Sequence, residues 1–245
     1  MKLRKNLLKK SRLYPVRSPV LRATTSRRGY LAKSPRERLA TSNGVYLILD
    51  RPKFSRFSLK KIKSLVSGKE VSLIQLRDKY GSKADVLKSA IKLAKEIAST
   101  KTLFIVNDYV DIAAVSLADG VHLGQDDLSL KQARKVLGED KIIGISCHNL
   151  SQALRAQEEG ADYIGIGPVY ATATKPGSKP IGLKAAVELK TKIKIPYFVI
   201  GNIHEGNIEK ISAAGIRRVA VCRAILEAQN PNQAAKSLYA KLKKI

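Results

Sequence analysis

Eight short apolar runs, separated by longer stretches with helical periodicity, constrain the fold of this chain more than any other feature. Each run is rich in Val, Ile and Leu and is bounded by Gly, Asn, Asp or Pro, which predicts a strand. Because the runs are apolar almost throughout, we expect a parallel sheet covered by helices. The expected strands span residues 45–49, 71–76, 102–106, 120–123, 142–146, 163–167, 197–200 and 218–222.

Two parallel architectures fit this alternation. Eight strand–helix units within residues 45–245 suit a single α/β domain, a (β/α)8 TIM barrel, near the short end of that fold's size range. A doubly wound open sheet is the alternative, but no G-x-G-x-x-G motif follows the first expected strand, where a dinucleotide-binding sheet has it. The sequence therefore favours the barrel, and we expect Ser82 and Ser151 to cap two of its helices.

The first 44 residues differ from the rest of the chain in charge. They hold 13 Lys and Arg against one acid, Glu37, in a chain with a formal net charge of +26. This Ser-, Thr- and Arg-rich composition is typical of an organelle transit peptide. A disordered basic arm, or an upstream stretch added by a misplaced start, fits equally well. We expect residues 1–44 to be a basic extension of a barrel at 45–245, located in the cytoplasm or, with a transit peptide, in an organelle.

Composition also excludes several classes of protein. No stretch reaches the roughly 20 apolar residues of a membrane-spanning helix. Cys147 and Cys222 are the only cysteines, too few for a disulfide framework or a zinc cluster. No nucleic-acid-binding module is present, and aromatic residues do not alternate with the basic ones. The excess of cations instead suits small phosphate-bearing ligands, and the sequence leaves a homo-oligomer open.

Polar residues gather where the expected strands end, which is where a TIM barrel places its chemistry. In the motif QLRDK, alternation puts Gln75, Arg77 and Lys79 on one side of the extended chain and Leu76 and Asp78 on the other. An amide and two cations on one side suit a multiply charged anion, because a guanidinium binds phosphate oxygens in a fork and an ammonium adds a point charge. The alternative is a solvated strand end whose cations pair with local acids.

Two acids follow neighbouring strands. Asp108 comes after the third expected strand and Asp127 after the fourth, so their carboxylates approach one another in a barrel. Mg²⁺ uses oxygen ligands and is often held by one or two carboxylates together with substrate phosphates. The sequence therefore predicts a magnesium site, and helix N-capping by either Asp is the alternative. Of the two adjacent residues Asp126 and Asp127, Asp126 is the less favoured ligand for Mg²⁺.

Further polar loops follow the last three strands. A loop rich in Gly, Thr and Lys after the sixth strand offers hydroxyls, backbone N–H groups and Lys175 to a phosphate, and the segments after the seventh and eighth strands offer a second phosphate site. Two phosphate sites and one metal predict two phosphorylated substrates. His148 is either a general base or a hydrogen-bonded structural residue.

Taken in order, the motifs QLRDK, VNDYVDIA, ADGVHLGQDDL, GISCHN and GADYIGIGPVYATATKPG resemble the thiamine-phosphate synthase family from about Val45 to the C-terminus. The resemblance implies a (β/α)8 enzyme of thiamine biosynthesis. Such an enzyme joins hydroxymethylpyrimidine pyrophosphate to a thiazole phosphate and releases pyrophosphate.

The resemblance also implies roles for individual residues. Asp108 and Asp127 would hold Mg²⁺. The catalytic residues would be Arg77, Lys79, Ser146 and Lys175. The pyrimidine pyrophosphate would be bound by Gln75, Arg77, Lys79, Asn107, Ser146 and Lys175, and the thiazole phosphate by Thr172, Thr174, Asn202, Cys222 and Arg223.

Two positions depart from the family pattern. Asn202 stands where the family usually has the second Gly of Gly-Gly-Ile, and Arg223 where it usually has the Ser of Ser-Ala-Ile. Asn is the least costly replacement for a left-handed Gly, whereas Arg223 either adds a phosphate contact or crowds the pocket. Two rival functions therefore remain. One is the thiazole tautomerase of the same fold, with His148 as its acid and base, and the other is a non-catalytic phosphate-ligand sensor.

Overall fold

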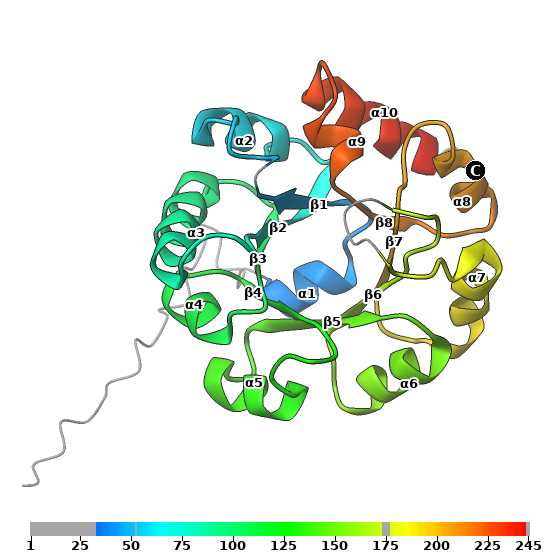
Figure 1. Cartoon of the computed structure of the whole chain (residues 1–245), viewed down its shortest axis with the longest axis horizontal. Helices are drawn as coiled ribbons and strands as arrows, with labels where there is room; N and C mark the ends of the chain where they lie inside the picture. The colour runs from blue at the N-terminus through cyan, green and yellow to red at the C-terminus, as the bar shows by residue number, and fades with distance from the viewer. Residues whose placement is uncertain (1–32, 52, 173–176, 244–245) are drawn as a thin grey trace, which may run out of the picture. The chain divides into compact units, whose positions relative to one another are not determined.

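The structure, a computed structural model, describes residues 33–51, 53–172 and 177–243 (Figure 1). Its eight parallel strands follow one another around a closed barrel, and β8 pairs with β1. The TIM barrel is confirmed and the doubly wound sheet is wrong. The strands are β1 (Gly44–Asp50), β2 (Val71–Arg77), β3 (Leu103–Asn107), β4 (Gly120–Leu123), β5 (Ile142–Cys147), β6 (Tyr163–Ile166), β7 (Tyr197–Ile200) and β8 (Arg218–Val221).

Every expected strand range agrees with the observed strand to within one residue at either end. The reason is burial on both faces, since all positions of β1, β3 and β4 are buried. One apolar layer lies between the strands and the surrounding helices. A second fills the inside of the barrel and consists of Leu39, Tyr46, Ile48, Leu73, Leu103, Ile105, Ile142, Tyr163, Phe198 and Ala220.

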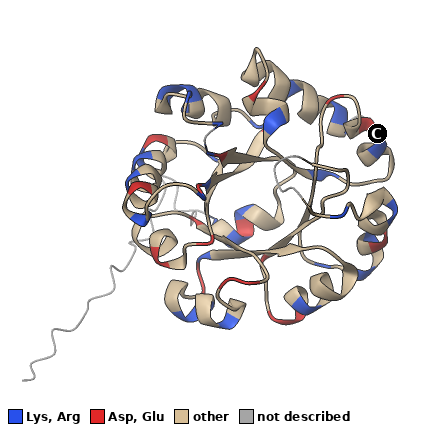
Figure 2. Ribbon diagram, in the orientation of Figure 1, with Lys and Arg blue, Asp and Glu red and all other residues tan. Residues whose placement is uncertain are grey.

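Helices surround the barrel, and Figure 2 shows Lys and Arg spread over many of them around the ring. Ser82 caps α3, as expected, because its hydroxyl accepts from the backbone N–H of Asp85. The expectation for Ser151 is wrong: the Asn149 side chain caps this helix. The helices are α1 (Pro35–Ala40), α2 (Leu59–Val66), α3 (Lys83–Ile97), α4 (Val110–Val115), α5 (Leu130–Leu137), α6 (Leu150–Glu158), α7 (Gly182–Lys192), α8 (Ile208–Ala213), α9 (Arg223–Leu226) and α10 (Pro231–Lys243).

Helix α1 covers the end of the barrel where the strands begin (Figure 1). Its Leu39 is 1% exposed and belongs to the interior apolar layer. Arg38 donates to the backbone carbonyl of Lys101, just before β3, and Arg36 pairs with Asp162, just before β6, at 2.5 Å. These contacts close the amino end of the barrel, so the opposite, carboxyl end is the one that stays open.

The chain consists of two units, Met1–Lys33 and Ser34–Ile245. The first unit lies outside the described residues except for Lys33, so the basic extension stays a prediction there. From Ser34 onward the chain belongs to the unit that contains the barrel. None of the helices in the described part of the chain has the length and apolar character needed to cross a membrane.

Candidate active site

The carboxyl ends of the strands surround a cavity of about 750 Å³, and all eight strands contribute to its wall. Every predicted site residue that the structure describes lines this one cavity. Thr174 and Lys175 lie outside the described residues. The residues brought together are Gln75, Arg77, Lys79, Asn107, Asp108, Asp127, Ser146, Thr172, Asn202, Cys222 and Arg223.

The QLRDK motif at the end of β2 has the predicted sidedness. Gln75, Arg77 and Lys79 line the cavity, whereas Leu76 is buried away from it. Arg77 forms an ion pair with Asp50, which ends β1 and is 6% exposed. The alternative of a solvated strand end is therefore only partly right, since the cations do have acid partners but line a cavity. The sequence analysis missed Asp50, because its pairing with Arg77 depends on the register of β1 and β2.

Asp108 and Asp127 face the same part of the cavity. The Lys79 ammonium lies 2.5 Å from Asp108, and the Asp127 carboxylate accepts from the backbone N–H of Gly124 at 2.6 Å. Burial is the main cause that raises the pKa of Asp108, Lys79 opposes it, and the negative charge of Asp127 raises that pKa further. Neither acid caps a helix, because the cap residues of α4 and α5 are Tyr109 and Ser129, so the capping alternative is wrong.

These carboxylates fit a divalent cation. Two like charges that repel each other in a half-buried site gain stability when a cation lies between them. The described residues contain no cluster of three or more His, Cys, Asp or Glu side chains suited to a metal. Mg²⁺ does not need such a cluster, since one or two carboxylates and substrate phosphate oxygens are its common ligands.

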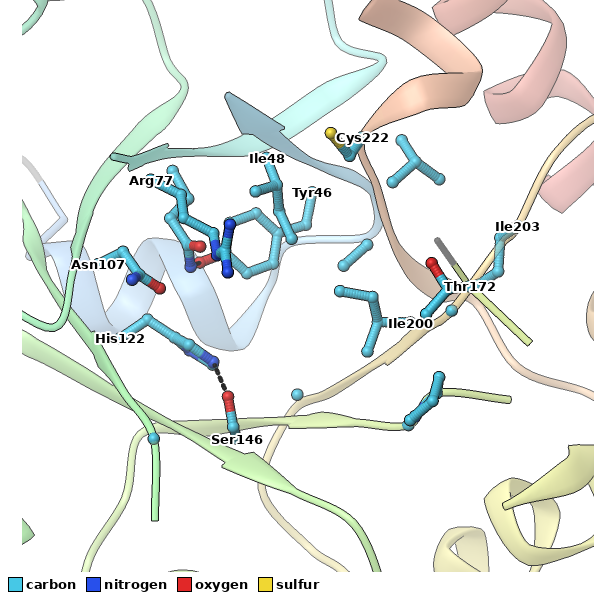
Figure 3. Close-up of a pocket in the computed structure, with 18 of the residues that line it drawn as sticks. Tyr46, Ile48, Arg77, Asn107, His122, Ser146, Thr172, Ile200, Ile203 and Cys222 are labelled. Carbon is cyan, nitrogen blue, oxygen red and sulfur yellow. Dashed lines mark hydrogen bonds between the residues drawn. The ribbon is translucent and has the colours of Figure 1, made fainter. Parts of the chain in front are cut away.

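The cavity wall holds a hydrogen-bonded polar cluster, in which the sequence analysis identified Gln75 and Ser146 but missed the three rings that connect them. His122, on β4, contacts the Ser146 hydroxyl through Nε2 at 2.9 Å (Figure 3) and the Tyr163 hydroxyl through Nδ1 at 2.9 Å. Tyr46 contacts Tyr163 at 2.8 Å and accepts from the Gln75 amide at 2.5 Å. The sequence signal that could have identified Tyr46, His122 and Tyr163 is that each is a polar ring within an otherwise apolar strand.

The buried position of His122 gives the protein a pH-dependent stability. Burial lowers the pKa of His122 from 6.5 to about 4. The unfolded chain therefore binds a proton below pH 6.5 while the folded chain does not until about pH 4, and stability falls as the pH drops through that window. We expect the free energy of unfolding to lose about 2 kcal/mol from this residue between pH 7 and pH 5. Urea unfolding of the wild type and His122→Gln at both pH values measures it, and equal pH dependence in the two proteins would contradict it.

The segments after β7 and β8 meet through the two residues that depart from the family pattern. Asn202 has a left-handed backbone with φ of 48°, as expected for a residue in place of Gly. Its side-chain oxygen accepts from the Arg223 guanidinium at 3.2 Å. Arg223 is thus held at the cavity wall by a side chain that Gly does not have, and the two substitutions form one feature.

Two other cavity residues, a histidine and a cysteine, belong to types that can react. The Nδ1 atom of His148 lies 2.7 Å from the backbone carbonyl of Gly167, a contact that fits both a structural residue and a base whose ring is oriented through Nδ1. Burial raises the pKa of the Cys222 thiol from 9.0 to about 12. Because the thiolate is the nucleophilic form, Cys222 is not set up for covalent catalysis.

The family model described as Thiamine monophosphate synthase matches residues 45–225. The chain belongs to the thiamine monophosphate synthase family. The matched region runs from β1 into α9 and so includes every residue named above as lining the cavity. The resemblance seen in the sequence motifs is confirmed.

Curated relatives and solved structures of this family agree with the match. A thiamine-phosphate synthase from Clostridium acetobutylicum is 40% identical over 82% of this chain and 95% of its own length. One from Synechococcus sp. (strain WH7803) is 46% identical over 69% of this chain and 48% of its own length, so the chain spans about half of that relative. A solved thiamine phosphate pyrophosphorylase from Pyrococcus furiosus is 29% identical, covers 85% of this chain and 98% of its own, and superposes with a TM-score of 0.75.

Proposed function

We propose that this chain joins the pyrophosphate of 4-amino-5-hydroxymethyl-2-methylpyrimidine to 4-methyl-5-(2-phosphoethyl)thiazole and so forms thiamine monophosphate and pyrophosphate. The observation that carries the proposal is the single cavity that combines two cations from the end of β2 with two carboxylates after β3 and β4. A metal-bound pyrophosphate needs both kinds of group, because the cations bind its oxygens and the carboxylates bind the metal ion. The family and its relatives support the same reaction.

The first half of the site is proposed to hold the pyrimidine pyrophosphate. Arg77 and Lys79 neutralise charge that develops on the leaving pyrophosphate, and the Ser146 hydroxyl donates to one of its oxygens. Asp108 and Asp127 would hold Mg²⁺, which supplies further neutralisation of that leaving group. Lys175 is also proposed to bind the pyrophosphate. Gln75 and Asn107 are proposed to orient the pyrimidine.

In the second half of the site, Thr172, Thr174 and the segments after β7 and β8 are proposed to hold the thiazole phosphate. The mechanism is proposed to be dissociative: pyrophosphate departs with the bonding electrons and leaves a carbocation-like methylene carbon that the electron-rich aminopyrimidine stabilises. The thiazole nitrogen then attacks that carbon, and no protein nucleophile is needed. Holding two reactants in line supplies roughly 7–11 kcal/mol in favourable cases. The two substrates, once bound in the cavity, are proposed to keep water from this carbon.

The direct test is to incubate the full chain with both substrates and Mg²⁺ and to follow thiamine monophosphate by chromatography. Product formation supports the proposal. If both substrates bind and no product forms, the sensor function replaces it. Isomerisation of the thiazole without product would instead identify a tautomerase, a function for which the facing carboxylates have no use.

Arg223→Ser removes the guanidinium at the second phosphate site. We expect the KM for the thiazole phosphate to rise about tenfold with little change in kcat, because hydrogen bonds to charged groups are worth roughly 1.5–3 kcal/mol. Steady-state kinetics with each substrate varied in turn measures the change. The KM for the pyrimidine pyrophosphate is the internal control and should stay constant. A lower KM for the thiazole phosphate would show that Arg223 crowds the pocket.

A further inference from the structure

A chain of buried hydrogen bonds connects two polar groups of the cavity wall, one on β2 and one on β5. Its successive heavy-atom distances are 2.5, 2.8, 2.9 and 2.9 Å. Four of its five side chains line the cavity, and the fifth, Tyr163, is fully buried behind them. In order, the members are Gln75, Tyr46, Tyr163, His122 and Ser146.

The fold makes room for this chain and fixes its rings. Gly144 pairs with Tyr163 across β5 and β6, and a Cβ atom at Gly144 would lie 2.1 Å from the Tyr163 ring. A Cβ atom at Gly165 would lie 3.3 Å from the His122 ring. Phe198 packs edge-on against Tyr163 with 5.7 Å between the ring centroids. Because the rings cannot swing aside, the hydrogen-bonding atoms stay in contact.

The direction of the hydrogen bonds follows from the orientation of the Gln75 amide together with the number of hydrogens that each group carries. His122 is neutral near pH 7 and carries one N–H, because burial lowers its pKa to about 4. The Gln75 amide donates to Tyr46. Tyr46 then donates to Tyr163, Tyr163 donates to Nδ1 of His122, and the Nε2–H of His122 donates to Ser146. Each of the first four members uses one hydrogen within the chain, and the Ser146 hydroxyl hydrogen remains for a ligand in the cavity.

If the hydrogen bonds run in the opposite direction, Ser146 no longer offers a hydroxyl hydrogen to the cavity. If Gln75 turns its carbonyl oxygen toward Tyr46, each hydroxyl must donate the other way to remain satisfied. His122 then carries its hydrogen on Nδ1, and Ser146 donates to Nε2. The hydroxyl hydrogen of Ser146 is consumed, so only its lone pairs face the cavity. A phosphate oxygen, which accepts hydrogen bonds, gains nothing from Ser146 in that state.

We propose that Tyr46, Tyr163 and His122 are positioning residues that tie the amide orientation of Gln75 to the hydroxyl direction of Ser146. Pyrophosphate bound at Ser146 thereby fixes which atoms Gln75 presents to the rest of the substrate. This inference rests on the proposed function, because it takes a pyrophosphate group as the ligand of Ser146. It adds a coupling, through side chains in the barrel core, between the residue that binds the pyrophosphate and the residue that orients the pyrimidine of the same substrate.

The His122 tautomer reports the direction. In the full chain labelled with ¹⁵N-histidine, long-range ¹⁵N–¹H spectra distinguish an Nε2–H from an Nδ1–H imidazole, and the spectrum of His122→Gln assigns the signal among the three histidines. We expect an Nε2–H tautomer for the ligand-free wild type. An Nδ1–H tautomer would overturn the proposal without any variant being needed.

Gln75→Glu reverses the direction at the far end of the chain. A carboxylate only accepts hydrogen bonds, so Tyr46 must donate to it and His122 is expected to change to the Nδ1–H tautomer at pH 8.5. Gln75→Met is the matched control, because it removes the amide without demanding a donor and should keep Nε2–H. In Tyr46→Phe, where the chain is cut, the added Gln75→Glu change should leave the tautomer at Nε2–H. An unchanged tautomer in folded Gln75→Glu would refute the link.

Binding of inorganic pyrophosphate with Mg²⁺, measured by titration calorimetry, tests the effect at Ser146. Gln75→Glu also adds a negative charge, so its cost is compared in the wild-type and Ser146→Ala backgrounds. We expect the loss of affinity to be about tenfold larger when Ser146 is present, since a hydrogen bond to a charged group is of that order. Equal losses in both backgrounds would overturn the link. A wild type that binds no pyrophosphate would refute the proposed function, while the tautomer would still decide the direction.

Discussion

Asp127→Asn and Asp108→Asn are each expected to lower kcat for thiamine monophosphate formation by about 10²–10³, the usual scale for losing a group that stabilises developing charge. In Asp127→Asn, the new amide oxygen can still accept from the backbone N–H of Gly124, as the Asp127 carboxylate does. Asn also tolerates the left-handed backbone of Asp108, whose φ is 63°. The loss would therefore report the carboxylate charge, and steady-state kinetics over a range of Mg²⁺ concentrations measures it.

Asp126→Asn is the control for these two variants. Asp126 also lines the cavity and is the chain neighbour of Asp127, but it has no proposed role in metal binding. It should keep a rate near that of the wild type, with the same dependence on Mg²⁺. If Asp127→Asn kept the full rate at every Mg²⁺ concentration, the metal assignment would be wrong. Removal of metal with EDTA should abolish wild-type activity, and added Mg²⁺ should restore it.

Arg77→Ala is expected to lower kcat by about 10², because the guanidinium neutralises charge on the leaving pyrophosphate and binds its oxygens in a fork. The substitution also removes the ion-pair partner of Asp50, which is nearly buried. A stability loss is therefore expected as well, since a buried charge without its partner is costly. Single-turnover kinetics separates the chemical step from this effect, and added guanidinium ions should restore part of the rate.

Arg51→Ala provides a matched comparison. Arg51 follows β1, pairs with Asp78 at 2.7 Å and does not line the cavity. Arg51 and Arg77 therefore each pair with an aspartate near the ends of β1 and β2, but only Arg77 lines the cavity. We expect Arg51→Ala to leave kcat nearly unchanged. If both variants lost activity equally, the effect would come from disturbing the strand ends and not from the pyrophosphate.

Much of the candidate site was predictable because strand order fixes which chain ends meet. Once eight strands form a barrel, the residues that follow β2, β3 and β4 must share one mouth, and alternation separates Lys79 from Asp78. Gln75 and Asp127 were found in this way. Asp50 was not found, because only the register of β1 and β2 reveals that it pairs with Arg77.

The sequence by itself determined the number, order and direction of the strands, since burial on both faces leaves a long apolar signature in each run. It also determined which acids and cations gather at the mouth. Only the tertiary structure decided which polar side chains contact one another inside the barrel, below these acids and cations. The contact between His122 and Tyr163 depends on inward-facing glycines in β5 and β6 and on interior side-chain volume. Such contacts join residues far apart in the chain, and no local pattern of residues encodes them.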